Sequence, residues 1–95
     1  MTTDAEPVRY RSDVIEQLWR HGVHPTQRTR PALVHEFVSD LYRFELRRLR
    51  DRLVAREFPK TEYFGRVVGL RRQYWLISMR AGDWLRELET QDLRI

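Results

Sequence analysis

One long stretch decides the fold of this chain: residues 31–56 read PALVHEFVSDLYRFELRRLRDRLVAR, with no glycine and no further proline after Pro31. Leu, Arg, Glu and Ala dominate it, and these residue types have high helix propensity. Proline suits the first turn of a helix, whereas Pro59 disfavours helical angles at Phe58. The sequence therefore predicts one long helix that begins at Pro31 and ends near residues 56–57.

The apolar side chains of this helix fall on two arcs. At about 100° per residue, one arc contains Leu33, Val34, Phe37, Leu41 and Phe44. The other lies roughly 120° around the cylinder and contains Tyr42, Leu46, Leu49 and Leu53. A straight helix with one neighbour would need only one arc. The helix is also about 39 Å long, against a diameter of about 32 Å for a compact globule of this size. We therefore expect another segment or another chain to cover part of it.

A shorter helix is expected earlier in the chain, over residues 13–21. Ser12 is in position to cap its N-terminus, and Gly22 suits the left-handed conformation in which many helices end. Residues 1–11 carry mixed charge and few large apolar groups, so we expect a flexible N-terminal tail there. Residues 12–95 are then expected to form a single helical domain.

A third helix is expected to start at Pro59, because apolar residues recur at helical spacing over residues 63–74. Its broad apolar arc predicts a well-buried helix, and the short connection predicts an antiparallel hairpin with the long helix. A short C-terminal helix capped by Asp83 completes a small all-α bundle of three main helices. The same region is rich in β-favouring residue types, so the alternative is an α+β fold with a β-hairpin over residues 63–79.

The chain lacks the sequence patterns of the main catalytic and cofactor-binding classes. Without cysteine it has no disulfide, thiolate ligand or thiol nucleophile. Its histidines lack the spacing of a metal motif, its serines lie outside G-x-S-x-G, and its glycines form no phosphate-binding loop. Most carboxylates lie three or four positions from an arginine, the spacing of exposed helical ion pairs. We therefore expect no enzyme activity, cofactor, metal site or small-molecule substrate.

The apolar content of the chain indicates no membrane partner. The polar N-terminus lacks the apolar stretch of a signal peptide. The longest apolar run, residues 74–77, is far shorter than the ~20 residues that a membrane span needs. The expectation is a cytoplasmic protein.

The basic residues suggest one function. There are 18 Lys+Arg against 14 Asp+Glu, a net charge of +4. Candidate phosphate-binding residues are Arg43, Arg47, Arg50, Arg71 and Arg72, which could give nonspecific binding to a nucleic-acid backbone. Against this, acidic residues are interleaved with them. All but one of the basic residues are arginine, which a GC-rich genome also produces without selection for binding.

The apolar residues suggest a function of a different class, and this is the preferred interpretation. The divided apolar surface of the long helix accompanies three tryptophans in a short chain. Aromatic residues and arginine are enriched at protein interfaces. We therefore expect a non-enzymatic interaction module whose partner is a second copy, giving a homo-oligomer, or another protein. The expected interface residues on the long helix are Phe37, Leu41, Phe44, Leu46, Leu49 and Leu53.

Overall fold

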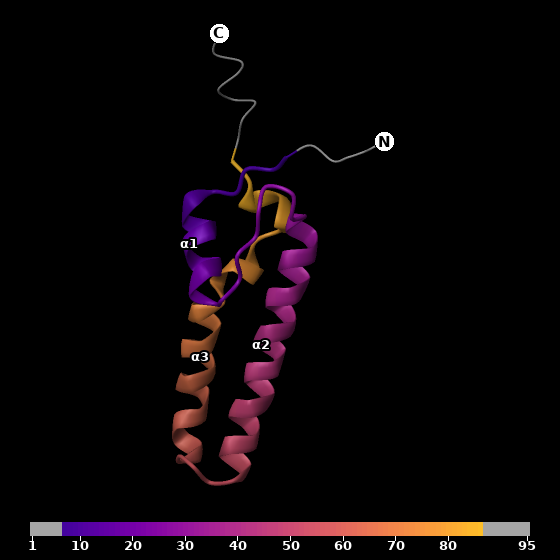
Figure 1. Cartoon of the computed structure of the whole chain (residues 1–95). Helices are drawn as coiled ribbons and strands as arrows, with labels where there is room; N and C mark the ends of the chain where they lie inside the picture. The colour runs from indigo at the N-terminus through magenta and orange to yellow at the C-terminus, as the bar shows by residue number, and fades with distance from the viewer. Residues whose placement is uncertain (1–6, 87–95) are drawn as a thin grey trace. The chain divides into compact units, whose positions relative to one another are not determined.

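The structure is a computed structural model that describes residues 7–86, and it is helical throughout this range apart from loops and one β-bridge (Figure 1). The elements in chain order are α1 (Ser12–Arg20), α2 (Pro31–Val54), the 3-10 helix η1 (Lys60–Glu62), α3 (Tyr63–Gln73), and the 3-10 helices η2 (Trp75–Ser78) and η3 (Ala81–Trp84). The predicted all-α class is confirmed. The alternative β-hairpin over residues 63–79 is wrong, because α3 and η2 occupy that range.

The chain divides into two compact units, and each is described by itself. One unit is His35–Ser78, and the other comprises the chain before and after it. The prediction of a single domain over residues 12–95 stays a prediction. Residues 1–6 of the expected tail and residues 87–95 lie outside the described residues.

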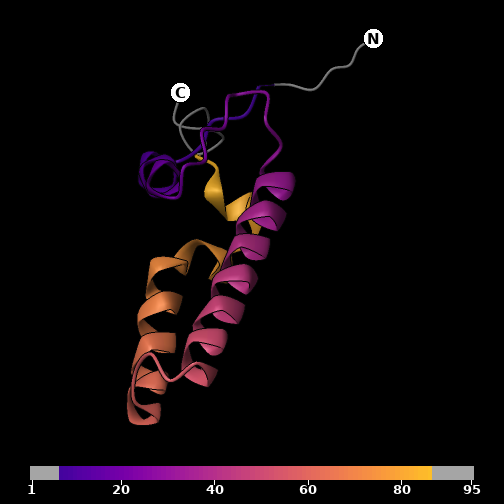
Figure 2. The same ribbon diagram turned by 60° about the horizontal axis from the view of Figure 1, so that its bottom comes forward.

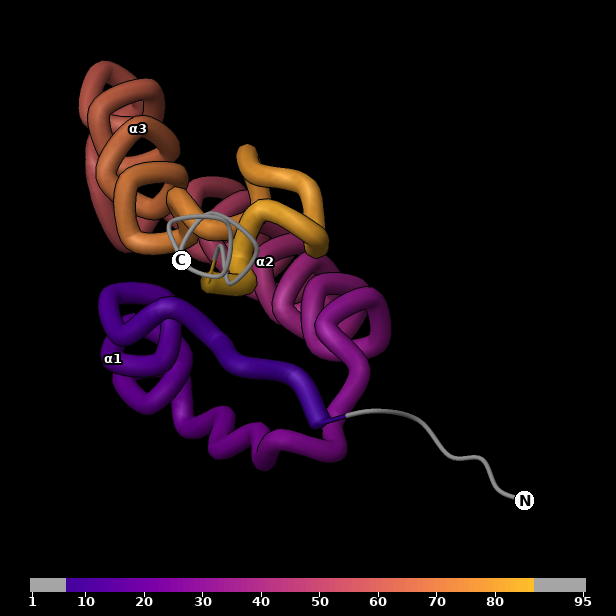
Figure 3. The backbone as a smooth tube through the Cα atoms, turned by 90° about the horizontal axis from the view of Figure 1, so that it is seen from above, coloured from indigo at the N-terminus to yellow at the C-terminus, as the bar shows by residue number. Residues whose placement is uncertain are grey.

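The unit that contains α1 holds the segment before this helix by backbone pairing. Tyr10 forms an antiparallel bridge with Leu85, and its hydroxyl donates a hydrogen bond to the Thr29 carbonyl at 2.6 Å. The amide of Val8 donates to the Gln27 carbonyl at 2.8 Å. Figure 3 follows the backbone from residues 7–11 into α1 and out through the loop that leads to α2. Tyr10 is buried as a result.

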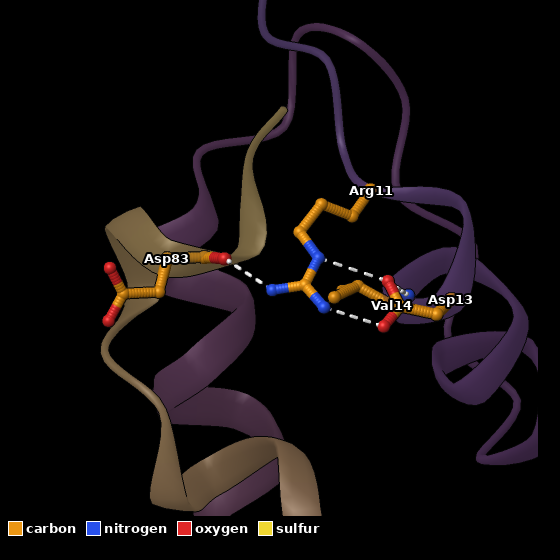
Figure 4. A network of polar contacts seen from close by, with 4 residues as sticks. All are labelled: Arg11, Asp13, Val14 and Asp83. Carbon is orange, nitrogen blue, oxygen red and sulfur yellow. Dashed lines mark hydrogen bonds and ion pairs between the residues drawn. The ribbon is translucent and has the colours of Figure 1, made fainter. Parts of the chain in front are cut away.

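The start of α1 is stabilised by Arg11 and Asp13 rather than by the expected Ser12 cap (Figure 4). The Arg11 guanidinium donates to both Asp13 carboxylate oxygens, at 3.1 and 2.7 Å, and to the Asp83 carbonyl at 3.2 Å. The Asp13 carboxylate also accepts the Val14 amide at 2.9 Å. The bond from Arg11 is the main reason why the pKa of Asp13 is lowered. Ser12 is the first helical residue and makes no side-chain cap.

Elsewhere in this unit, the end of α1 and the region around Asp83 agree only in part with the predictions from the sequence. Gly22 has φ +77°, which confirms the predicted left-handed end after α1. Asp83 caps no helix over the described residues that follow it: it lies inside the 3-10 helix η3, which ends at Trp84, and the rest of the predicted C-terminal helix, from residue 87, lies outside the described residues. The chain is extended at Leu85, where the bridge to Tyr10 ends the helical geometry.

Helix α2 begins at Pro31 as predicted, but it ends at Val54, before the predicted residues 56–57. The cause is Arg56, which has φ +61°, the only non-glycine residue with positive φ in the described range. Its amide donates to the Leu53 carbonyl at 2.9 Å, and the Glu57 amide donates to the Arg52 carbonyl at 3.0 Å. These two bonds are those of a Schellman motif, in which the C′ residue is left-handed and is usually glycine.

In the unit His35–Ser78, α2 and α3 run side by side in opposite directions, the predicted antiparallel hairpin (Figures 1 and 2). Tyr74 holds the two helices together from the end of α3. Its ring lies 5.4 Å from the Tyr42 ring between centroids, and its hydroxyl donates a hydrogen bond to the Glu45 carboxylate. The buried apolar residues of this unit are Val38, Leu49, Phe58, Tyr74 and Leu76.

The prediction that the third helix is well buried is wrong. No residue of α3 itself is buried, and Phe64 is 77% exposed. A helix that packs against a single neighbour buries one narrow stripe of side chains, whatever the width of its apolar arc. At the two glycines of α3, Gly65 and Gly69, an added side chain would meet open space, so neither glycine makes a close helix contact among the described residues.

Replacing Tyr74 with phenylalanine tests the bond to Glu45. The ring stays, but the carboxylate loses its donor, so the free energy of unfolding should fall by about 1–2 kcal/mol. Denaturant unfolding followed by circular dichroism measures the change. Tyr63→Phe is the matched control, because the Tyr63 hydroxyl makes no hydrogen bond within the described residues. Equal stability of Tyr74→Phe and the parent chain would contradict this role.

The same variant has a pH signature. Burial, followed by the hydrogen bond and charge of Glu45, raises the pKa of Tyr74 above its ordinary value of 10.0. Above pH 10.0 the unfolded chain therefore releases a proton that the folded chain retains, and stability should fall as the pH rises further. Tyr74→Phe should make this decline shallower. The remainder belongs to Tyr10, whose pKa is also raised by burial.

Arg56→Gly tests the left-handed end of α2. Glycine adopts positive φ without the steric cost that arginine carries, so the variant should be more stable by about 1 kcal/mol. Arg50→Gly is the control, because the same change inside a helix should destabilise by about 1 kcal/mol. Thermal and denaturant unfolding should show shifts of opposite sign, and destabilisation by both variants would show that Arg56 is not strained.

Candidate interaction surface

Helix α2 carries exposed apolar side chains on an arc beside the one that forms the hairpin core. Phe37 is 53% exposed and Phe44 is 52% exposed, and Leu41 between them is half-buried. At about 100° per residue the three lie within a narrow sector of the helix, on successive turns. We call Phe37, Leu41 and Phe44 the outer patch. The structure thus leaves three members of the first predicted arc outside the hairpin core, whereas Val34 of the same arc is buried and belongs, with Leu33, to the other unit.

The second predicted arc lies on the hairpin side. Leu49 is buried there and lines the groove between the helices together with Leu70, while Leu46 and Leu53 are half-buried. Of the six predicted interface residues, the structure therefore groups three in the outer patch and places one, Leu49, in the groove between α2 and α3. A change at Leu49 would disturb the core of the hairpin, so this residue cannot test an interface by itself.

Exposed aromatic side chains are not confined to the outer patch. In the same unit Phe64 on α3 and Trp75 in η2 are exposed, and in the other unit Trp19 is exposed while Trp84 is fully buried. What distinguishes the outer patch is that its members follow one another along a single helix. Contiguous exposed apolar surface of this kind marks interaction sites in soluble proteins.

The candidate phosphate-binding arginines are exposed, but they are not equivalent. Arg43 forms an ion pair with Asp40, at 2.6 Å between Nη1 and Oδ1. No ion pair within residues 7–86 involves Arg47, Arg50, Arg71 or Arg72. The last two follow one another in the final turn of α3, beside an open hollow of about 570 Å³ that Val68, Trp75 and Ile77 also line.

The net charge is concentrated in one unit. Residues 35–78 contain ten basic and six acidic side chains, a net charge of +4, while the remaining sequence contains eight of each. Several of these cations lie over aromatic rings: the Arg66 guanidinium is 4.1 Å from the Phe58 ring centroid, and that of Arg48 is 6.0 Å from the Phe44 ring centroid. The hairpin is therefore a basic, partly apolar surface.

The groove between α2 and α3 has a volume of about 410 Å³. Glu45 is the only acidic residue that lines it, and its carboxylate accepts the Tyr74 hydroxyl. Residues 7–86 contain no cluster of three or more His, Cys, Asp or Glu side chains that could hold a metal ion. Sequence reasoning missed the Glu45–Tyr74 bond, because the two residues are 29 positions apart and neither belongs to a motif.

None of the helices in residues 7–86 combines the length and the apolar character that crossing a bilayer requires. No family model matches the chain, and comparisons with curated proteins and with solved structures find no match either.

Proposed function

We propose that this chain is a non-enzymatic protein–protein interaction module that self-associates through the outer patch. The observation that carries the proposal is the exposure of Phe37 and Phe44, about half of each side chain, two turns apart on one face of α2. Large aromatic side chains on a helix face gain most when a second apolar surface removes them from water. Covering both rings would stabilise the assembly by an amount on the order of 1 kcal/mol per ring.

The size of the hairpin supports the same proposal. Five buried apolar residues are few for a unit of this length, and domains below about 40–70 residues usually need an additional stabilising device. Disulfides are excluded because the chain has no cysteine. Association with a second copy would stabilise the hairpin by covering the apolar side chains exposed on its outside.

The polar contacts of the described residues fit a structural role. The ion pairs are Arg11–Asp13, Arg20–Glu16, Arg43–Asp40, Arg52–Glu57, Arg66–Glu62 and Arg80–Asp83, and all of them are at least partly exposed. Exposed pairs of this kind contribute at most about 1 kcal/mol each to stability. General acid–base catalysis instead needs a titratable group held in a partly desolvated cleft.

The double variant Phe37→Ser/Phe44→Ser tests the proposal. The parent chain should be a dimer or larger at micromolar concentration, and the variant should be a monomer of unchanged helix content, because both rings already lie outside the hairpin core. Sedimentation equilibrium and circular dichroism measure the two properties. Phe64→Ser, at a more exposed ring on α3, is the matched control and should associate like the parent. A parent chain that is monomeric at every concentration would refute self-association.

A second candidate function is nonspecific binding to a nucleic-acid backbone, which the concentration of charge in residues 35–78 favours. The double variant Arg47→Glu/Arg50→Glu should lose affinity for duplex DNA, and the parent affinity should fall steeply with salt. The control Arg20→Glu/Arg80→Glu makes the same charge change in the other unit and should bind like the parent. Fluorescence anisotropy with a labelled mixed-sequence duplex at low and high salt measures both, and equal binding by the two variants would reject this function.

A further inference from the structure

We propose that the second copy binds the outer patch with its α2 running in the opposite direction, so that acidic residues of each copy face basic residues of the other. This inference rests on the proposed function and adds the orientation and the recognition chemistry of the partner. It is carried by the order of four charged residues along one edge of the outer patch: Glu36, Asp40, Arg43 and Arg47.

These four residues lie on one side of α2. Their spacing of four, three and four positions keeps them within about 60° of one another on the helix, next to the sector of Phe37 and Phe44. All four belong to the unit His35–Ser78 and lie inside α2. Read from the N-terminus, these four residues are acidic, acidic, basic and basic, and Asp51 follows on the same side, four positions after Arg47.

Within a single copy, only the two middle residues of the charged edge form an ion pair. Asp40 and Arg43 form an ion pair in which both side chains are well exposed. Neither Glu36 nor Arg47 takes part in an ion pair within the described residues. In addition, Glu36 lies four positions from Asp40, and Arg43 lies four positions from Arg47, so each half of the edge places like charges on neighbouring turns.

An antiparallel second copy supplies opposite charges for Glu36 and Arg47, and it places opposite charges beside each pair of like charges. When two identical helices pack antiparallel about a two-fold axis, the same edge of each helix comes together with its direction reversed. Glu36 of one copy then lies opposite Arg47 of the other, and Asp40 lies opposite Arg43. The same axis brings Phe37 close to Phe44 of the other copy, so the apolar and charged contacts form in one register.

A parallel second copy would not do so. In a parallel pair the charged edge meets the opposite edge of the partner at the same level. The two charged edges would then lie on opposite sides of the contact, so Glu36 and Arg47 of one copy would not face Arg47 and Glu36 of the other. Charge complementarity of this kind selects orientation more than it sets affinity.

Cross-linking through introduced cysteines tests the orientation, and it is clean because the chain has no cysteine of its own. We would prepare Glu36→Cys and Arg47→Cys separately and treat each alone, and then an equilibrated mixture of the two, with a short bismaleimide. The antiparallel arrangement predicts that the mixture yields several-fold more cross-linked dimer than either variant alone. Thr61→Cys, at an exposed position in η1, is the control and should give none in any mixture.

A charge-reversal pair tests the recognition chemistry with a different readout. Glu36→Arg/Asp40→Arg makes the charged edge wholly basic, and Arg43→Glu/Arg47→Glu makes it wholly acidic. Each variant alone should dimerise at least about tenfold more weakly than the parent, while an equimolar mixture should form the heterodimer. Energy transfer between labelled copies measures association, and high salt should weaken the heterodimer.

The outcomes separate the two proposals. A monomeric parent chain refutes the proposed function, and the antiparallel inference falls with it. A dimeric parent in which Glu36→Cys cross-links to itself, or in which the mixture gives no cross-link, overturns the antiparallel orientation alone. A dimer in which neither charge-reversal variant is weakened shows that the charged edge does not recognise the second copy.

Discussion

The hairpin of residues 35–78 depends on a single helix–helix interface, and most of its features follow from that constraint. Two helices in contact share one seam, so each can bury one stripe of side chains and no more. The seam is closed by Tyr74, through its ring against Tyr42 and its hydroxyl on Glu45. Phe37, Phe44 and Phe64 lie outside this seam and are exposed.

The same constraint explains how the arginines are used. With little apolar surface available to cover the rings, guanidinium groups lie over the edges of the seam instead, as Arg66 and Arg52 do over Phe58. Arginine suits this position because its planar, weakly hydrated cation stacks on an aromatic face while it also pairs with a carboxylate. Arg66 does both, since it also bonds to Glu62 at 3.1 Å. The excess of arginine is thus partly structural, and counting basic residues overstates the charge available to a ligand.

The sequence predicted those features that local chemistry controls. Pro31 fixed the start of α2, and Gly22 the end of α1, because each residue restricts or permits particular backbone angles. It did not predict the end of α2, because an arginine at a left-handed position leaves no compositional signal. Periodicity gave the apolar arcs of α2 and α3 but not the number of neighbours each helix has. The burial of α3 was therefore overestimated, and only the structure could assign Phe37, Leu41 and Phe44 to the outside.

Apolar area and charge order contribute different things to such a surface. Exposed rings on a helix face favour contact with many apolar surfaces, because the hydrophobic effect has no direction. A binding module needs a second feature that rejects wrong partners and wrong orientations. On α2 this feature is the charged edge beside the rings, in which two acidic residues precede two basic ones. The same edge of a second copy running in the opposite direction is complementary to it. A different protein could use the same site only by presenting a basic-then-acidic edge beside an apolar strip, so the order of charges restricts the partners far more than the rings do.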